Sequence, residues 1–422
     1  MNEKCVDIMK INVDRSGGKL GVVSEIHDLM FASLSQGAST LDELIDRSAM
    51  ELLVAINELA SGGRPHTFRL LEWTQKVYAA STASLLFGKH NPIAREPSLA
   101  IDFWTWDRNL GSLLFLPLPR ITTPEVYEAR ERLVAGFRDY VSAKRYDGVD
   151  GAAEIIRKRI ETVQRHGFDV DGIAREEMSF LFAAITNTAI TSFWLVLRIC
   201  SDPHLLQVIR DEITAISQKA DSIRREALVL NVDRLTNECP LLLSTYRETL
   251  RTISDISSNR LVTEDTMLCS KDGHTYRLRK GSLLQISGGA MHSNPALWSS
   301  NPDDFEPRRF LQDKSTQNKT AFRAFGGGST LCPGRHLAAA EVLLWTAAIV
   351  QGFDVSFEGA KGTPFKIPSN CGDRLPVHVC EPAEDVIATM RPRVQSINFS
   401  RGQKRPRIIL KPGEELLGGL QD

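Results

Sequence analysis

The chain has 422 residues, of which 42% are hydrophobic, 24% charged and 7% aromatic. This usage is ordinary for globular proteins and excludes disordered, collagen-like and disulfide-scaffold proteins. With 51 Lys and Arg against 52 Asp and Glu, the net charge is -1, so no overall basic field attracts nucleic acid. The seven cysteines form no CxxC pair, which is typical of reduced thiols. Several Asp, Glu and Lys residues lie within the first twenty positions, so we expect neither a signal peptide nor an N-terminal membrane anchor.

Helical periodicity dominates the sequence and predicts a mainly α protein. The predicted helices span residues 39–60, 68–86, 124–144, 152–166, 203–219, 239–252 and 335–352. Segment 178–200 is apolar and long enough to cross a bilayer, but Thr186, Asn187 and Thr188 lie near its centre and no charge-asymmetric loops flank it. We therefore expect it to be a core helix rather than a membrane span.

A small sheet is predicted late in the chain. Segments 260–268 and 274–286 read as strands, and KDGH at 271–274 reads as the turn of a hairpin. Segment 292–330 is rich in Asn, Pro, Asp, Ser and Gly, as long functional loops often are. After residue 394 the sequence becomes polar and basic. We therefore expect one domain over residues 1–394 and a solvated tail over 395–422.

The sharpest motif is FGGGSTLCPGR at residues 325–335, followed at once by an apolar helical pattern. Its glycines allow the backbone to approach a flat group closely. Backbone N–H groups just before a helix can stabilise the thiolate of Cys332, and that is how a sulfur ligand for iron is held. The motif resembles the ligand signature of the cytochrome P450 family: Phe325, Gly328, Cys332 and Gly334 stand at all four of its characteristic positions.

The resemblance implies a cytochrome P450 fold, mainly α with a small β-sheet region and lacking its N-terminal part. It implies haem b as the cofactor, with Cys332 as the axial iron ligand and Phe325, Gly328 and Gly334 in the haem-binding loop. The reaction implied is insertion of one oxygen atom of dioxygen into a lipophilic molecule of terpenoid, sterol or polyketide class, in secondary metabolism. Electrons would come from NADPH through a separate reductase, and the protein would be a monomer that binds no nucleic acid.

Three further elements follow the family order. Glu248 and Arg251 lie three residues apart on a predicted helix, and the resemblance adds Arg309, in the run PRRF, to complete a buried network. Arg260 resembles the arginine that pairs with a haem carboxylate. Thr330 stands where many members carry an arginine for the same purpose, so Arg260 gains importance.

The core helix carries the run AITNT at residues 184–188, where the family usually has Ala-Gly-x-acid-Thr for proton delivery. Asn187 replaces the acid, so the relay would run through Thr188 and water, with Asn187 beside it. Threonine hydroxyls bonded to carbonyls one turn earlier would also explain this cluster without chemistry. The run from Asn187 to Trp194 resembles the branch that contains steroid 7α-hydroxylases and prostacyclin synthase.

The resemblance places Ala183, Ala184 and Ile256 in the substrate pocket, with further walls from residues 253–257 and 369–375. Family members of this type reside on the endoplasmic reticulum, and without an anchor this chain would be peripheral or soluble. The helix expected around 27–35 lacks the Trp and Arg that this family offers to haem there. Two alternatives stay open: a haem-thiolate isomerase or dehydratase that acts on a peroxide, and a truncated relative without catalysis.

Overall fold

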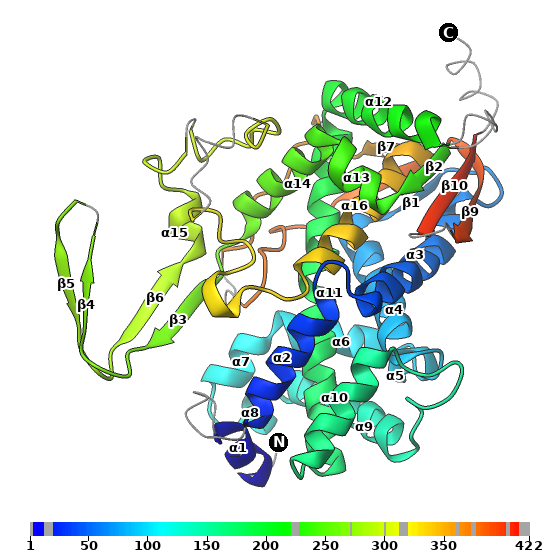
Figure 1. Ribbon diagram of the computed structural model, residues 1–422. Coiled ribbons are helices and arrows are strands. Elements are labelled where there is room, and N and C mark those ends of the chain that lie inside the picture. Colours follow the sequence, from blue (N-terminus) through cyan, green and yellow to red (C-terminus); the bar gives the residue numbers. More distant parts are fainter. Residues whose placement is uncertain are drawn as a thin grey trace.

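The computed structural model describes residues 3–11, 20–220, 228–270, 272–298, 301–311, 320–359, 363–372, 377–401 and 406–412. Helices dominate these residues, as predicted, with small antiparallel sheets (Figure 1). The first half contains α1 (Glu3–Lys10), α2 (Val22–Leu34), α3 (Ser39–Ala60), β1 (His66–Arg69), α4 (Leu70–Phe87), α5 (Pro92–Arg95), α6 (Leu99–Arg108), α7 (Leu110–Phe115), α8 (Pro119–Thr122), α9 (Pro124–Ser142), α10 (Glu154–Arg165) and α11 (Val170–Ser201).

The second half holds most of the strands. It contains α12 (Pro203–Ala220), β2 (Leu228–Asn231), α13 (Val232–Glu238), α14 (Pro240–Ile253), β3 (Ser257–Leu261), β4 (Thr266–Cys269), β5 (Thr275–Leu278), β6 (Leu283–Ser287), α15 (Gly288–His292), the short 3-10 helix η1 (Gly328–Thr330), α16 (Arg335–Gly352), β7 (Phe353–Phe357), β8 (Ile387–Pro392), β9 (Val394–Arg401) and β10 (Pro406–Pro412). All seven predicted helices are confirmed to within two residues at each end. Among the described residues, α1, α5, α6, α7, α8, α13 and α15 were not expected.

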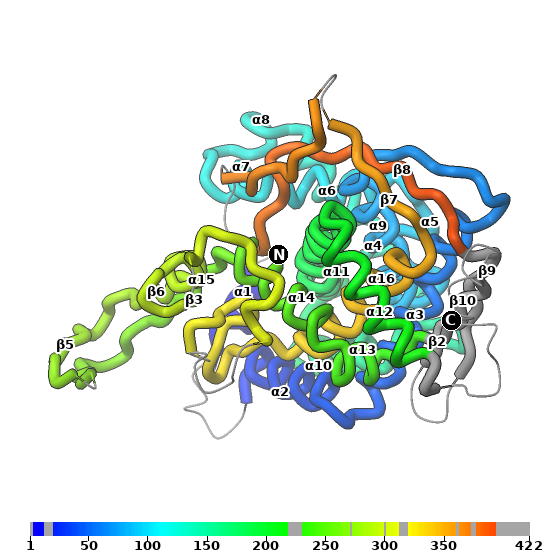
Figure 2. Tube along the Cα trace, turned by 90° about the horizontal axis from the view of Figure 1, so that it is seen from above, coloured from blue at the N-terminus to red at the C-terminus, as the bar shows by residue number. Residues whose placement is uncertain are grey.

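Helix α11 is the centre of the fold and contacts α4, α9, α12, α14 and α16 (Figures 1 and 2). Of the residues described, this is the one helix long and apolar enough to cross a membrane, and 72% of its apolar window is buried inside the protein. Phe193 and Trp194 are fully buried in its second half. The structure therefore confirms the prediction of a core helix, whose C-terminal half is buried on all sides.

The late strands form an arm that projects from the helical body (Figure 2). β3 pairs with β6, and β4 pairs with β5 as the predicted hairpin, with Cys269 opposite Thr275. Lys271, in the predicted turn, lies outside the described residues. Elsewhere β8 joins β1 to β7, so that residues 66–69 lie beside residues 387–390.

The expected solvated tail is the main error in the fold prediction. β9 and β10 pair with each other, and β10 also pairs with β2, so the segment after residue 394 contributes two of the three strands of a sheet. Residues 402–405 and 413–422 of that segment lie outside the described part of the chain. Its average composition is polar, and this concealed the β-branched and aromatic residues that favour strands in 394–412. The pairing partner, β2, lies more than 160 positions away and gave no local signal.

Candidate active site

The loop before α16 turns the sulfur of Cys332 toward the start of that helix. Cys332 N–H donates to the Phe325 carbonyl at 2.9 Å, which closes the loop. Gly326 and Gly328 have φ of 73° and 65°, values that favour glycine. Burial raises the pKa of the Cys332 thiol, while the N–H groups of Gly334 and Arg335 donate to the sulfur and favour the thiolate. The sequence motif therefore folds into a preformed holder for a sulfur ligand.

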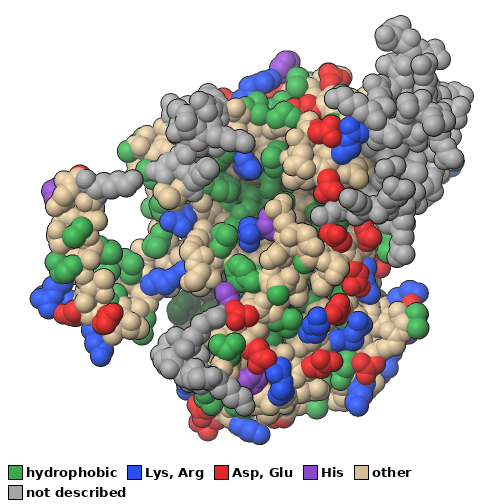
Figure 3. Space-filling view, viewed as in Figure 1, with side chains coloured by type: hydrophobic (Ala, Val, Ile, Leu, Met, Phe, Trp, Pro, Cys, Tyr) green, Lys and Arg blue, Asp and Glu red, His purple; other side chains and the backbone are tan. Residues whose placement is uncertain are grey.

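A cavity of about 490 Å³ opens above this sulfur, between α11 and the Cys332 loop. Its lining includes eight of the predicted residues: Ala183, Ala184, Asn187, Thr188, Ile256, Phe325, Cys332 and Gly334. The two predicted loop and rim residues Gly328 and Arg260 do not line it. Of the predicted wall segment 253–257 only Ile256 lines the cavity, and residues 369–372 do not line it; residues 373–375 lie outside the described chain. Hydrophobic side chains gather in the middle of the molecular face between the strand arm and the helices (Figure 3).

The polar cluster of α11 is mostly satisfied within the protein. Thr188 Oγ1 donates to the Ala184 carbonyl at 2.7 Å, and Thr186 Oγ1 donates to the Phe182 carbonyl at 3.0 Å. This is the bonding to the preceding turn that offered a non-catalytic explanation of the cluster. Asn187 behaves differently, because its Oδ1 accepts the N–H of Val379 at 3.2 Å, and Val379 also lines the cavity.

The structure brings Glu248, Arg251 and Arg309 together in a buried network. Arg251 donates to both carboxylate oxygens of Glu248 at 2.8 Å, and Arg309 Nε donates to Glu248 Oε1 at 3.0 Å. All three side chains are at most 3% exposed. The arginines also donate to the carbonyls of His292, Asn301 and Asp304. The network therefore ties α14 to the segment that precedes the Cys332 loop.

His292 extends this connection without acting as a ligand. The N–H of Arg323 donates to His292 Nε2 at 2.8 Å, so Nδ1 carries the proton and donates to the Ser254 carbonyl at 2.8 Å. Burial lowers the pKa of His292 and keeps the ring neutral. The two ring nitrogens thus attach α15 both to the loop that leads to Cys332 and to the end of α14.

Two side chains flank Thr330 at the rim of the cavity, Arg260 and His27. Arg260 Nη2 donates to Thr330 Oγ1 from β3. On the other side, His27 Nε2 of α2 lies 3.0 Å from the Ser329 carbonyl. Thr330, the departure from the family pattern, therefore connects the rim arginine to the cavity wall, and α2 supplies a histidine near the loop.

Sequence reasoning missed several wall residues. These are Met30, Leu34, Leu44, Thr82, Leu85, Leu86, Ile155, Phe180, Thr191, Tyr246, Leu250, Ser258, Leu337, Glu341 and Val379, among others. Most are ordinary apolar helix residues, whose sequence gives no sign that they face a cavity. Glu341 did give a signal, because it is an acid within the apolar run AAAEVLLW.

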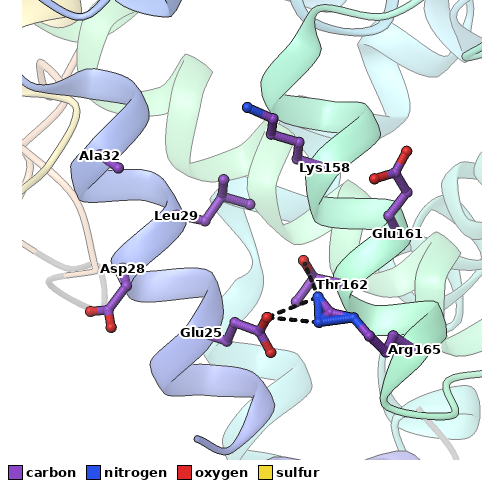
Figure 4. A pocket seen from close by; sticks show the side chains of 8 residues that line it. All are labelled: Glu25, Asp28, Leu29, Ala32, Lys158, Glu161, Thr162 and Arg165. Atoms are coloured by element: carbon purple, nitrogen blue, oxygen red, sulfur yellow. Dashed lines mark hydrogen bonds and ion pairs between the residues drawn. The ribbon is translucent and has the colours of Figure 1, made fainter.

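A second hollow, of about 580 Å³, lies on the surface between α2 and α10 (Figure 4). Its walls are mostly charged, and Arg165 donates to Glu25 Oε1 at 2.8 Å. None of the predicted site residues lines it. Glu25 and Arg165 pair with each other, and Lys158 pairs with Glu154 of the same helix. Among the residues that the structure describes, the hollow holds no sulfur ligand and no apolar chamber like that of the Cys332 cavity.

The residues of the Cys332 cavity fit a haem. One soft sulfur ligand faces an enclosed and mainly apolar space, glycines keep its loop free of bulky side chains, and Arg260 stands at the rim where a carboxylate can reach it. Thr82, which lines the cavity and is 2% exposed, has a buried hydroxyl with no hydrogen-bond partner among the described residues, so it can bond to a group bound in the cavity.

Comparison with known proteins agrees with this geometry. A cytochrome P450 monooxygenase of Gibberella zeae is 28% identical over 84% of this chain and 68% of its own length. A cholesterol 7-alpha-monooxygenase of Cricetulus griseus is 28% identical over 54% of this chain and 47% of its own length, in agreement with the predicted resemblance to steroid 7α-hydroxylases. The chain thus spans only part of these relatives.

Structural comparison supports the same fold. The retinoic acid-bound cyanobacterial CYP120A1 matches with a TM-score of 0.65 and 20% identity, over 87% of this chain and 78% of its own. The family model described as Cytochrome P450 matches residues 22–372, which is well over half of the chain. With the Cys332 loop, the buried Glu248 network and this match in agreement, the chain belongs to the cytochrome P450 family.

Proposed function

We propose that this protein is a haem-thiolate monooxygenase that inserts one oxygen atom of dioxygen into a lipophilic small molecule. The observation that carries the proposal is the sulfur of Cys332 in the floor of a mainly apolar cavity, beneath the threonines of α11. Bound haem would supply the oxygen chemistry. Membership of the cytochrome P450 family implies both haem and a partner that donates electrons. The remaining steps belong to the residues of this chain.

Each residue group has a distinct task. Cys332 would hold the haem iron through its sulfur, since a metal ion favours the deprotonated thiol. Arg260, supported by Thr330, binds a carboxylate of the cofactor at the rim. Ala183, Ala184 and Ile256 exclude water and orient an apolar substrate. The hydroxyl of Thr188 can turn from the Ala184 carbonyl to hold a proton-donating water, with Asn187 beside it.

We propose a terpenoid, sterol or polyketide as the substrate class and NADPH as the electron source through a separate reductase. The lining of the cavity supports this class. Among its described residues only Glu341 carries an ionisable carboxyl group, and the rest of the wall is mainly apolar, which suits bulky apolar molecules. Fungal P450 monooxygenases and steroid 7α-hydroxylases among the relatives agree with a role in secondary metabolism or in sterol chemistry.

We also propose a peripheral association with the endoplasmic reticulum membrane. The short helices α7 and α8 and the link between them expose Phe115, Leu118 and Ile121 to solvent, each by more than two thirds of its surface. Such an apolar cluster can insert into the interface of a bilayer. Binding to vesicles, lost when these residues are changed to serine, would test this.

The test of the main proposal is the carbon monoxide difference spectrum of the dithionite-reduced protein. A red-shifted Soret band typical of thiolate ligation is expected, and Cys332→Ala should abolish it. A band at the position of nitrogen-ligated haem, or failure to bind haem by a folded protein, would contradict the proposal and favour a relative without catalysis.

Asn187 supports one alternative, an isomerase or dehydratase that acts on a peroxide. Its amide is engaged with Val379 and supplies no acid. Conversion of an organic peroxide in the absence of both NADPH and dioxygen would favour this alternative, whereas product formation that consumes both would exclude it.

A further inference from the structure

Glu341 is a buried acid in the wall of the Cys332 cavity. It lies on α16, only 4% exposed, and it is the one charged side chain among the described residues that line the cavity. Its neighbours Ala340 and Val342 are buried apolar residues. An ionised carboxylate in such surroundings is costly unless it is compensated. Glu341 therefore has a high cost in this mainly apolar helix unless its carboxyl group is protonated or paired.

The compensation that the structure offers is small. Ser48 Oγ of α3 donates to Glu341 Oε1 at 2.9 Å. Within the described part of the chain, no Lys, Arg or His forms an ion pair with Glu341, and burial raises its pKa to about 7. Glu177 provides a contrast, because it is equally buried but lies 3.3 Å from Arg159 Nε and does not line the cavity.

The other titratable groups near this part of the cavity stay neutral. Tyr78 of α4 feels the charge of Glu341, and its hydroxyl shares a hydrogen bond of 2.6 Å with Ser192 of α11. Tyr246 of α14 lies near Cys332. Burial raises the pKa of both phenols far above neutrality. Burial also raises the pKa of Glu177 of α11 to about 7 and lowers that of His336 of α16, but neither residue lines the cavity. Glu341 is therefore the acid among the described lining residues whose charge can change near pH 7.

We propose that Glu341 is a redox-linked proton acceptor, which takes up one proton when the iron held by Cys332 accepts one electron. The inference rests on the proposed function, because it requires haem in the cavity. Reduction adds a negative charge to a space of low dielectric constant, and this makes a second negative charge on Glu341 more costly. The step is balanced: dithionite or the reductase supplies the electron, ferric iron becomes ferrous, and solvent supplies the proton that neutralises the carboxylate.

The consequence is a reduction potential that depends on pH. Between about pH 5.5 and about pH 8.5 the potential of the wild-type holoprotein should fall as the pH rises. A tenfold difference in proton affinity between the ferric and ferrous states corresponds to about 59 mV for a one-electron couple, and we expect a total fall of at least this size. Spectroelectrochemical titration with dithionite and mediators measures it at equilibrium without any substrate.

Two variants make the test specific to Glu341. Glu341→Gln keeps an acceptor for Ser48 but cannot ionise, so its potential should be flat over this range. Ser48→Ala removes a hydrogen bond that favours the ionised form, so the fall in potential should move to higher pH. Glu177→Gln is the matched control, because it removes a buried acid outside the cavity lining and should leave the wild-type profile unchanged.

Infrared difference spectroscopy provides an independent readout on the wild type. The reduced-minus-oxidised spectrum at neutral pH should gain the carbonyl band of a protonated carboxylic acid, and Ser48→Ala should shift it. Absence of this band, or a wild-type slope that persists in Glu341→Gln, would overturn the inference. A protein that fails to give the thiolate carbon monoxide spectrum would instead overturn the proposed function on which it rests.

Discussion

Asn187 Oδ1 accepts a hydrogen bond from the backbone N–H of Val379 at 3.2 Å, so a side chain of the central helix α11 holds a loop segment that lines the cavity. Neighbouring contacts hold the same segment: Trp194 Nε1 donates to the Cys380 carbonyl at 2.9 Å, and the N–H of Cys380 donates to the Ile253 carbonyl at 2.7 Å. Asn187 thus positions the wall of the cavity, whatever its part in proton transfer.

The first prediction concerns this contact. Asn187→Ala leaves the buried N–H of Val379 without its acceptor, and this should lower the free energy of unfolding by about 1–3 kcal/mol. Asn187→Asp keeps an acceptor and should fold normally. Denaturant unfolding followed by haem absorbance measures the difference, and equal losses in both variants would show that the hydrogen bond is not the cause.

Loss of one member of the Glu248 network should be severe. Arg309→Met leaves Glu248 short of a partner at a site that is 0% exposed, and we expect a loss of about 3–5 kcal/mol in the free energy of unfolding. The matched control is Arg277→Met, which breaks an exposed pair with Asp265 and should change little. Similar losses in the two variants would contradict the structural role of the network.

The rim arginine should control retention of the cofactor. Arg260→Met removes the cation that we propose binds a haem carboxylate, and it should raise the rate of haem loss about tenfold, as measured by transfer to apomyoglobin. Thr330→Val removes only the supporting hydroxyl and should have a smaller effect. An unchanged rate in Arg260→Met would remove Arg260 from the haem site.

His378 predicts a pH dependence of stability. Its Nε2 lies 3.1 Å from the Asp107 carboxylate, and both side chains are buried. Burial alone lowers the pKa of His378, but the hydrogen bond and charge of Asp107 outweigh it, so the folded pKa is raised above the unfolded value. The stabilisation is then complete below the unfolded pKa of His and is lost as the pH rises through the raised pKa. Thermal unfolding measured across this range should show the loss, and His378→Asn should abolish it.

Much of the site could be predicted because its chemistry is local. The loop from Phe325 to Gly334 is one continuous run, and the pair Glu248 and Arg251 lies within a single helical turn. The third partner, Arg309, was predicted by resemblance, since a separation of 58 residues has no periodicity to reveal it. The walls from α2, α3 and α4 were missed, because an apolar helix residue has the same pattern whether it faces a core or a cavity.

The sequence by itself determined the family and the helical class and singled out Cys332 as the proposed sulfur ligand, because residue types at short spacings set local conformation and ligand chemistry. Only the tertiary structure decided which hydroxyls of α11 bond to their own helix and that β10 pairs with the distant strand β2. It also showed that Glu341 is buried in the wall of the same cavity as Cys332. These depend on contacts between distant segments. The cost of an isolated charge is a property of such surroundings and not of the residue alone.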